Sequence, residues 1–430
     1  MADECLNLSA EMEEFIVEVC DKIGPRPPCS EAEKKGAEYY KEKINNYCDE
    51  IDIEPFIIRL GAYKAGFRLP MIFFIAALGL HMVSPMVSLL CMIISLYILF
   101  GKMILARPVI DFMFPQKSSQ NVIAKIKPLS NNAKQLVIFG SHIDSNWEYP
   151  LFRMFGNRFT IFLIINVLVA TVFSLFLVVE NILIVVHNAE VLSGISQAAI
   201  WIFGLIGVPF ALLQIFFLIS NRPVMGANDN LSGMAVCYEL AKTFSSPESR
   251  PESVEIWIAA FGCEETCSMG SKAFIEKHWE DIQNAKVISF DTLGFDSDLH
   301  VHSAEISNMI KMTPEMVELV LESAREIEVP IIPKSVPFYT DSMSFIRKRI
   351  TATALSSWPT SPKHFYYHTR YDIPENLAFV NLVNSYKVGV NLVKKLDHMN
   401  DCTAKSPFQP PKFPKIGGCS ELGYTPEPPA

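Results

Sequence analysis

The sequence is poor in charged residues. Only 19% of its 430 residues are Asp, Glu, Lys or Arg and 50% are hydrophobic, whereas an ordinary soluble domain carries about a quarter charged residues. The shortage is concentrated in two stretches, 69–101 and 159–221, whose only ionisable residues are His81, Glu180, His187 and Glu190. This composition excludes a disordered chain and disfavours a purely soluble enzyme.

Basic runs, paired cysteines and a signal-peptide pattern are also missing. The formal net charge is -9 and no Lys/Arg run is sustained, which argues against nucleic acid as a partner. The segment MADECLNLSAEMEEF lacks the charged-then-apolar pattern of a cleaved signal peptide. The ten cysteines are scattered without paired spacing. We therefore expect free thiols in a reducing compartment.

The two apolar stretches are long enough to cross a bilayer, which needs about 20 apolar residues per helix. The second stretch holds one uncharged span at 159–179 and another around 200–219, with the more polar segment 180–197 as the presumed turn. The first stretch, 69–101, is long for one membrane-spanning helix and short for two. A break at HMVSP, residues 81–85, favours a hairpin of two helices. We expect four membrane spans rather than a soluble core.

Basic residues flank both hairpins but are missing from the presumed turns. The flanking set comprises Arg59, Lys64, Arg68, Lys102, Arg107, Lys117, Arg153, Arg158 and Arg222. By the positive-inside rule these flanks are cytoplasmic, and we expect Arg68 and Lys102 to extend the first hairpin by snorkelling. The expected protein is a multi-pass protein of the cell membrane, with its soluble part and both termini in the cytoplasm.

Outside these stretches, helix and strand patterns alternate. Ser30 and Glu33 form a capping box that predicts a helix from Ser30 to about Asn45. Short apolar runs predict strands at 51–58, 121–126, 135–139, 254–261 and 287–290, and amphipathic patterns predict helices at 231–244, 314–327 and 377–396. The alternation indicates an α/β fold with a largely parallel sheet.

Acidic and imidazole residues gather where the predicted strands end. The segments are GSHIDS, GANDNLSG, GCEETCSMGS, SFDTLG and, in a late loop, YYHTRYD. Ligands of open α/β sheets bind beyond the carboxyl ends of the strands. An oxygen-and-nitrogen ligand set without thiolate suits one or two catalytic zinc ions. Cys263 and Cys267 flank the Glu pair and are interpreted as packing residues.

The segments also carry a resemblance. IGPRP, GSHIDS, GANDNLSG, FGCEET, SFDTLG, TDSMSF and YHTRYD occur in the order of the motifs of the co-catalytic di-zinc exopeptidases, metallopeptidase family 28, which includes bacterial leucyl-type aminopeptidases and glutamate carboxypeptidase. The resemblance implies a three-layer zinc-peptidase fold around a mixed, largely parallel sheet. Here that fold is interrupted by two transmembrane helical hairpins.

Carried over by position, the resemblance implies a ligand set of five residues. His142 and Asp291 hold one zinc, Glu265 and His368 hold the other, and Asp229 bridges the two. Cobalt or manganese can occupy the same ligands, because availability often decides between such metals.

The resemblance also implies catalytic roles. Glu264 is the general base, which takes a proton from the attacking water and later gives it to the leaving amine. Asp144 hydrogen-bonds the imidazole of His142 and thereby orients it. Tyr367 donates to the tetrahedral oxyanion. Ser342 stands where many relatives have histidine, which leaves substrate selectivity open.

The motifs and inserts together predict the domain organisation. Residues 1–68, 107–152 and 222–400 form one catalytic domain, 69–106 and 153–221 are the two transmembrane hairpins, and 401–430 is a Pro/Gly-rich tail. The second hairpin accounts for the unusually long separation of His142 from Asp229. Each insert must cross the bilayer an even number of times, since otherwise the metal ligands would lie on opposite sides.

The resulting hypothesis is a membrane-anchored zinc exopeptidase, specifically an aminopeptidase acting on membrane-proximal peptides. Three alternatives remain: an acyl transferase of the glutaminyl cyclase type, an inactive membrane scaffold of the same fold, and a transporter. The complete ligand set disfavours the first two, and the uncharged spans disfavour the third. The lipid bilayer and a peptide are the expected partners, and the oligomeric state stays open.

Overall fold

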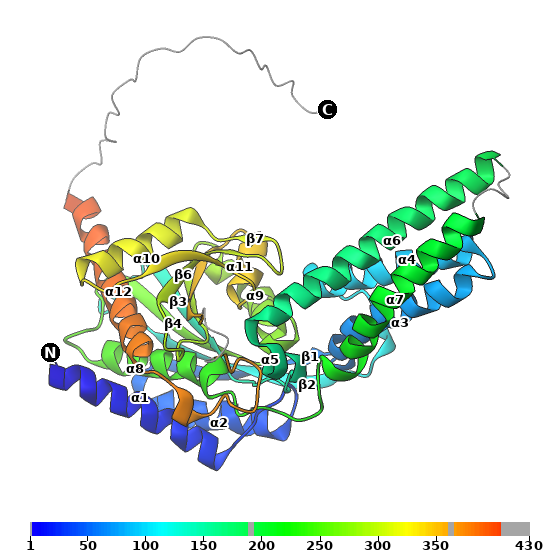
Figure 1. Cartoon of the computed structure of the whole chain (residues 1–430). Coiled ribbons are helices and arrows are strands. Elements are labelled where there is room, and N and C mark those ends of the chain that lie inside the picture. Colours follow the sequence, from blue (N-terminus) through cyan, green and yellow to red (C-terminus); the bar gives the residue numbers. More distant parts are fainter. Residues whose placement is uncertain (1, 188–192, 360–364, 406–430) are drawn as a thin grey trace, which may run out of the picture.

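The computed structural model describes residues 2–187, 193–359 and 365–405. An α/β domain is built around one sheet, and a bundle of four long helices projects from one end of it (Figure 1). The first helix, α1 (Ala2–Lys22), and the last, α12 (Val380–Lys405), both lie on the α/β domain. The predicted tail therefore starts inside α12, and its residues 406–430 lie outside the described residues.

Nine strands form a single sheet in the order β1-β2-β4-β3-β5-β9-β6-β7, with β8 paired to β6. The pairs β4–β3, β3–β5 and β5–β9 at its centre are parallel, whereas β1–β2, β2–β4, β9–β6 and β6–β7 are antiparallel. The fold is therefore α/β with a mixed sheet, which confirms the predicted class. The strands are β1 (Glu50–Ile58), β2 (Lys117–Ile126), β3 (Gln135–His142), β4 (Val254–Phe261), β5 (Lys286–Phe290), β6 (Leu299–Glu305), β7 (Ile310–Lys311), β8 (Ile332–Val336) and β9 (Thr351–Ser357).

Helices cover both faces of this sheet, because alternate strand residues point to opposite sides. Val137 and Phe139 of β3 pack into the core that α1, α12, α2, α8 and α10 cover, whereas Ile138 between them packs beneath α9 and α11. The result is the predicted three-layer arrangement. The covering helices are α2 (Glu31–Ile44), α8 (Ser232–Ser245), α9 (Met269–Ile282), α10 (Pro314–Glu326) and α11 (Ser342–Arg347).

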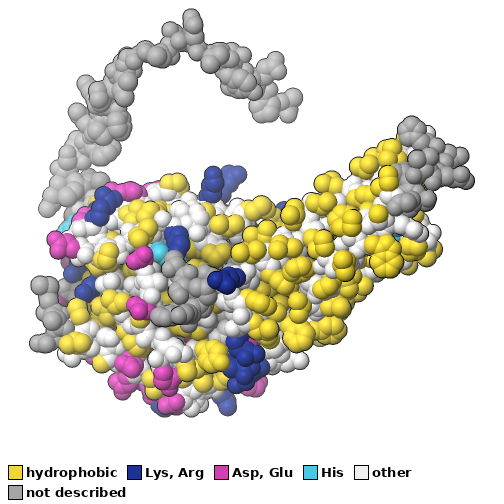
Figure 2. All heavy atoms as spheres, in the orientation of Figure 1, with side chains coloured by type: hydrophobic (Ala, Val, Ile, Leu, Met, Phe, Trp, Pro, Cys, Tyr) yellow, Lys and Arg dark blue, Asp and Glu magenta, His cyan; other side chains and the backbone are white. Residues whose placement is uncertain are grey.

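The bundle consists of two helical hairpins, each inserted between strands or motifs of the α/β domain. The first is α3 (Gly61–His81) with α4 (Pro85–Ile98), and the second is α6 (Phe159–His187) with α7 (Ser193–Phe217). Among the described residues, four helical spans are long and apolar enough to cross a membrane: Gly61–His81, Pro85–Ile104, Ile164–Val186 and Ile195–Phe217. The second of these is α4 together with the π-helical segment Leu99–Ile104 that continues it. Hydrophobic side chains dominate the visible bundle surface, while charged groups gather on the α/β domain (Figure 2).

The structure corrects the predicted turn at 180–197, and polar contacts inside the bundle give the reason. Residues 180–187 continue α6 and residues 193–197 belong to α7, so the turn is much shorter than predicted. Glu180 can lie buried in this apolar helix because both of its carboxylate oxygens have partners. Its Oε2 lies 2.7 Å from His81 Nε2 of α3, and Ser196 of α7 donates to its other oxygen. This cluster connects both hairpins near their far end (Figure 1).

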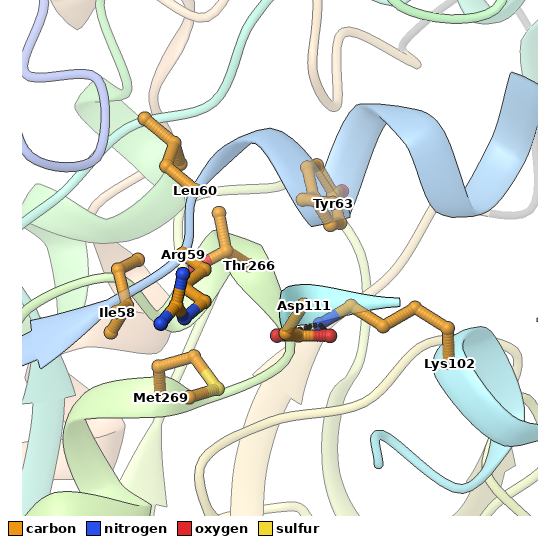
Figure 3. A pocket seen from close by; sticks show the side chains of 8 residues that line it. All are labelled: Ile58, Arg59, Leu60, Tyr63, Lys102, Asp111, Thr266 and Met269. Atoms are coloured by element: carbon orange, nitrogen blue, oxygen red, sulfur yellow. Dashed lines mark hydrogen bonds and ion pairs between the residues drawn. The ribbon is translucent and has the colours of Figure 1, made fainter. Parts of the chain in front are cut away.

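The junction between the bundle and the α/β domain is built from paired charges and aromatic rings. Lys102 is buried and donates to both carboxylate oxygens of Asp111, at 2.7 and 2.8 Å. The prediction that Lys102 snorkels to water is therefore wrong, because a local carboxylate neutralises it. Lys102 and Asp111 line a small cavity of about 10 Å³ together with Tyr63 and Thr266 (Figure 3). The cavity thus lies between the first hairpin and the segment that follows β4.

Close packing of the hairpins generates a stability prediction. A Cβ atom on Gly207 of α7 would lie 2.3 Å from Cζ of the buried Phe74 in α3. We expect Gly207→Leu to destabilise the protein by about 1–3 kcal/mol, because overpacking forces side chains and backbone to shift. Thermal unfolding of the detergent-purified variants measures this. Gly204→Leu is the matched control, since no atom lies within 4 Å of its Cβ position. An equal loss in both variants would contradict the packing.

Candidate metal centre

Three neighbouring strands bring the central residues of the site together. Strand β3 ends at His142, β5 ends one residue before Asp291, and β4 is followed by a short turn of helix, Glu264–Thr266. Because β4, β3 and β5 are adjacent and parallel, their carboxyl ends meet at one edge of the sheet. Asp229 reaches this edge from the turn before α8, and His368 reaches it from the loop before α12.

The five predicted ligands form two groups that share Asp229. His142, Asp229 and Asp291 offer ligand atoms within 4.8 Å of one another, and so do Asp229, Glu265 and His368. One oxygen of Asp229 lies 3.1 Å from His142 Nε2 and the other lies 2.9 Å from His368 Nε2. The structure therefore brings together all five residues, with Asp229 between the two groups. Their roles as ligands remain predictions.

The buried atoms of this cluster fit bound cations. Among the described residues, Glu265 Oε1 is buried without a hydrogen bond, and the close partners of His142 Nε2 and Asp229 Oδ2 are other members of the cluster, although buried polar atoms normally have a partner. Burial, followed by the charge of Asp229, raises the pKa of Glu265 to about 7, and burial raises the pKa of Asp291 well above its usual range. Imidazole nitrogens and carboxylate oxygens are ligands that zinc accepts, and cations there would relieve the crowding of negative charge.

Glu264 lies beside the two groups and belongs to neither. Its Oε2 is 3.9 Å from His142 Nε2, and Ser268 donates to its Oε1 at 3.1 Å. Burial raises the pKa of this carboxyl group well above its usual range. A buried carboxylate that is close to the ligands without being one has the position that a general base requires.

Asp144 contacts both His142, as predicted, and the Glu pair. Its carboxylate accepts the main-chain N–H groups of Glu264 and Glu265, at 3.0 and 3.1 Å. The Nδ1 atom of His142 lies 3.0 Å from the main-chain oxygen of Asp144 but 3.5 Å from its carboxylate. A hydrogen bond from Nδ1 to that carbonyl leaves Nε2 facing the cluster. Asp144 therefore orients the histidine through its backbone and holds the Glu pair through its side chain.

Tyr367 packs directly against the cluster. Its ring stacks on that of His368, with 3.7 Å between ring centroids and an interplanar angle of 20°. The side chain also contacts the aromatic cluster that contains Phe338 and Trp358. The position is compatible with a hydroxyl near the reacting atoms, and the predicted donation to an oxyanion remains a prediction.

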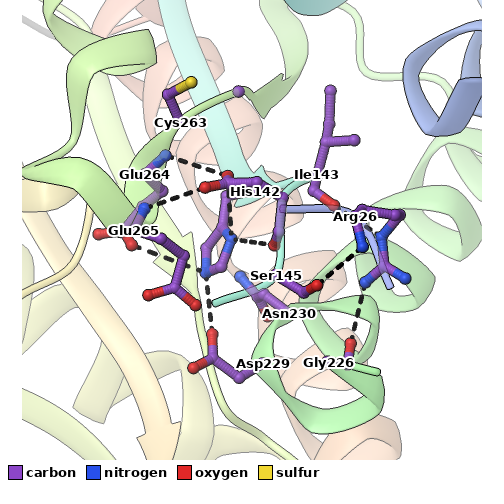
Figure 4. Close-up of polar contacts among 12 residues, drawn as sticks. Arg26, His142, Ile143, Ser145, Gly226, Asp229, Asn230, Cys263, Glu264 and Glu265 are labelled. Carbon is purple, nitrogen blue, oxygen red and sulfur yellow. Dashed lines mark hydrogen bonds and ion pairs between the residues drawn. The ribbon is translucent and has the colours of Figure 1, made fainter. Parts of the chain in front are cut away.

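Two charged residues of the quoted motifs hold the ligand loops, and sequence reasoning assigned them no role. The fully buried guanidinium of Arg26 donates to the carbonyls of Ile143, Met225 and Gly226, so it joins the loop after His142 to the loop before Asp229 (Figure 4). Asp372 accepts the N–H groups of Asn228 and Asp229, at 2.6 and 3.2 Å. For Arg26, the available signal in the sequence was a charged residue inside the proline-rich motif IGPRP.

The sequence analysis missed further neighbours of the cluster, because only contacts between distant segments of the chain place them there. Asn146 donates to Glu265 Oε2 and lies 3.2 Å from the ring nitrogens of His368. The Tyr149 ring lies 4.9 Å from that of His368, and its hydroxyl is 2.6 Å from the hydroxyl of Tyr63 in α3. The first hairpin thus reaches the cluster through Tyr63, and local sequence gives no signal of this.

Two groups of acidic and imidazole residues lie at the strand ends and share one aspartate. This arrangement has the form of a co-catalytic zinc-peptidase site. The family profile described as Peptidase family M28 matches residues 213–392. The matched segment contains four of the five predicted ligands, and His142 precedes it because the second hairpin intervenes. Among curated proteins, no sequence matches this chain significantly.

Solved structures share the fold. An aminopeptidase from Aneurinibacillus sp. strain AM-1 matches with a TM-score of 0.53 at 16% identity, covering 90% of this chain and 93% of that one. A zinc aminopeptidase from Bacillus subtilis matches with 0.54 at 15%, covering 90% and 95%. A Zn-dependent exopeptidase from Parabacteroides distasonis matches with 0.52 at 12%, covering 90% and 97%. These findings confirm the resemblance and the fold class, and they support the expected enzyme class, a metallo-aminopeptidase.

The contacts of Asp372 predict an effect on metal affinity. Asp372→Asn replaces one acceptor by an amide N–H that faces a main-chain N–H, so the Asp229 loop should lose its support. We expect zinc affinity to fall about 10–100-fold, as is typical when a residue that orients a metal ligand is lost. Competition with a chelating dye measures the affinity. The exposed Asp298→Asn is the control, and equal affinities in the two variants would contradict the proposed support.

Proposed function

We propose that this chain is a membrane-anchored, zinc-dependent aminopeptidase that removes N-terminal residues from peptides by means of two metal ions. The observation that carries the proposal is the pair of ligand groups joined by Asp229, with Glu264 beside them. The match to Peptidase family M28 supports the same reading. The titles of similar structures name zinc aminopeptidases, which favours an aminopeptidase over other exopeptidases.

The residues have distinct tasks in the proposed reaction. Zinc bound by the five ligands would polarise the scissile carbonyl and lower the pKa of the attacking water. Glu264 accepts the proton of that water and then donates it to the nitrogen of the leaving amine. Burial raises the pKa of this carboxyl group, which helps it to hold the proton between the two steps. Tyr367 donates its hydroxyl proton to the oxyanion.

Replacing the general base should separate catalysis from metal binding. We expect Glu264→Gln to retain two zinc ions per chain and to lose about 10²–10⁴-fold in kcat, because the base contributes a factor of this size. Elemental analysis and hydrolysis of unblocked aminoacyl substrates measure the two effects on detergent-purified protein.

The matched control is His368→Ala, which removes a predicted ligand and should lower zinc content as well as activity. N-terminally blocked peptides should resist the wild-type enzyme. Cyclisation of N-terminal glutamine without hydrolysis would instead favour the acyl transferase, and wild-type protein without zinc would favour the inactive scaffold.

We further propose that the α/β domain lies on the cytoplasmic side and acts on peptides held near the bilayer. Basic residues on the flanks of the hairpins support this side. Both hairpins contact the surroundings of the site. Tyr63 of α3 meets Tyr149, Phe159 of α6 packs on Phe152, and Tyr149 and Phe152 pack against His368. A peptide that emerges from the membrane would meet the site at short range.

Tethering should therefore favour hydrolysis. In proteoliposomes, a peptide carrying a C-terminal lipid anchor should show a KM at least about tenfold lower than the same peptide without the anchor, because both reactants share one surface. Amino-acid release measures turnover. The detergent-solubilised enzyme is the control, since dilution into micelles should remove the advantage. Equal KM values in proteoliposomes would contradict membrane-proximal substrates.

A further inference from the structure

Two cysteines from distant parts of the chain meet next to the general base. The Sγ atoms of Cys29 and Cys263 lie 3.5 Å apart. Cys29 belongs to the proline-rich segment before α2, and Cys263 directly precedes Glu264. Both are free thiols in this structure. The sequence analysis assigned Cys263 only a packing role, and the proposed peptidase mechanism uses neither thiol.

One carboxylate holds the two cysteines in place. Glu33 accepts the N–H of Cys29 at 2.8 Å with one oxygen and the N–H of Cys263 at 2.9 Å with the other. Ser119 donates to the same carboxylate at 2.9 Å, and the Glu33 side chain is fully buried. The capping-box glutamate therefore folds back over the start of its own helix to Cys29 and also bonds Cys263, so it fixes two separate backbone segments with their sulfurs 3.5 Å apart.

We propose that a hydroperoxide oxidises this pair to a Cys29–Cys263 disulfide and that the disulfide lowers peptidase activity. Cys29 is partly exposed and Cys263 is fully buried, so the oxidant meets Cys29 first. Its sulfur attacks the peroxide, the O–O bond breaks, and a sulfenic acid and one water form. The Cys263 sulfur then attacks that sulfur, the S–O bond breaks, and a second water leaves. Two thiols give two electrons to one hydrogen peroxide.

The effect on activity follows from the place of Cys263. A disulfide brings the sulfurs from 3.5 Å to about 2.0 Å, so the two side chains must move toward each other and pull on the backbone segments that Glu33 holds. Cys263 is in the left-handed region with φ 52, and its carbonyl accepts Met269 N and Thr266 Oγ1, each at 3.1 Å. A pull on Cys263 is therefore transmitted to the turn that carries Glu264, whose N–H is bound to Asp144.

Mass spectrometry and kinetics on zinc-loaded, detergent-purified protein test the proposal. After treatment with hydrogen peroxide, we expect a proteolytic peptide pair joined through Cys29 and Cys263. We also expect kcat to fall at least about tenfold, since a displaced general base loses much of its 10²–10⁴-fold contribution. Dithiothreitol should reverse both changes. Absence of the joined peptides, or their presence with unchanged kcat, would overturn the proposal.

Variants separate this disulfide from other oxidation. Cys29→Ser should keep its activity under peroxide, whereas Cys48→Ser, which changes another partly exposed thiol, should respond as the wild type does. Inhibition of Cys29→Ser equal to that of the wild type would overturn the proposal. The effect on kcat depends on the proposed peptidase function, but the joined peptides do not. An untreated enzyme without activity would therefore refute the proposed function, and missing joined peptides would refute the disulfide.

Discussion

The crowding of buried carboxylates at one edge of the sheet is the constraint on which the rest of the site depends. Asp229, Glu264, Glu265 and Asp291 lie together away from water, and an isolated buried charge costs several kcal/mol. The chain compensates with the imidazoles of His142 and His368, which face Asp229, and with the guanidinium of Arg26, which attracts the same carboxylate from a greater distance. It leaves several polar atoms of the cluster without hydrogen bonds. A site built in this way fits bound cations, which would offset the crowded negative charge.

The same constraint explains how two membrane hairpins can interrupt the domain. The residues that support the ligands come from every soluble segment: Arg26 from the first, Asp144 from the second and Asp372 from the third. The hairpins leave and re-enter the domain at points that these contacts hold together. They also add contacts of their own, because Tyr63 and Tyr149 meet beside His368. The apolar hairpins and the geometry of the site are therefore coupled.

Much of this could be predicted because it depends on local patterns. The strand at 254–261 and the helix capped by Ser30 follow from side-chain periodicity and one hydrogen bond, and the structure has both. Errors arose where a distant partner decided the outcome. Lys102 is neutralised by Asp111, and Glu180 is kept in its helix by His81.

The sequence by itself determined the fold class, the apolar spans and the identity of the residues that could bind metal, because composition, periodicity and motif order are local properties of the chain. Only the tertiary structure decided which atoms face one another. It placed Asp229 between two ligand groups, directed Glu33 to the backbone of two cysteines and brought Tyr63 to the site. Such contacts join segments far apart in the chain, and their distances are set by packing across the whole sheet.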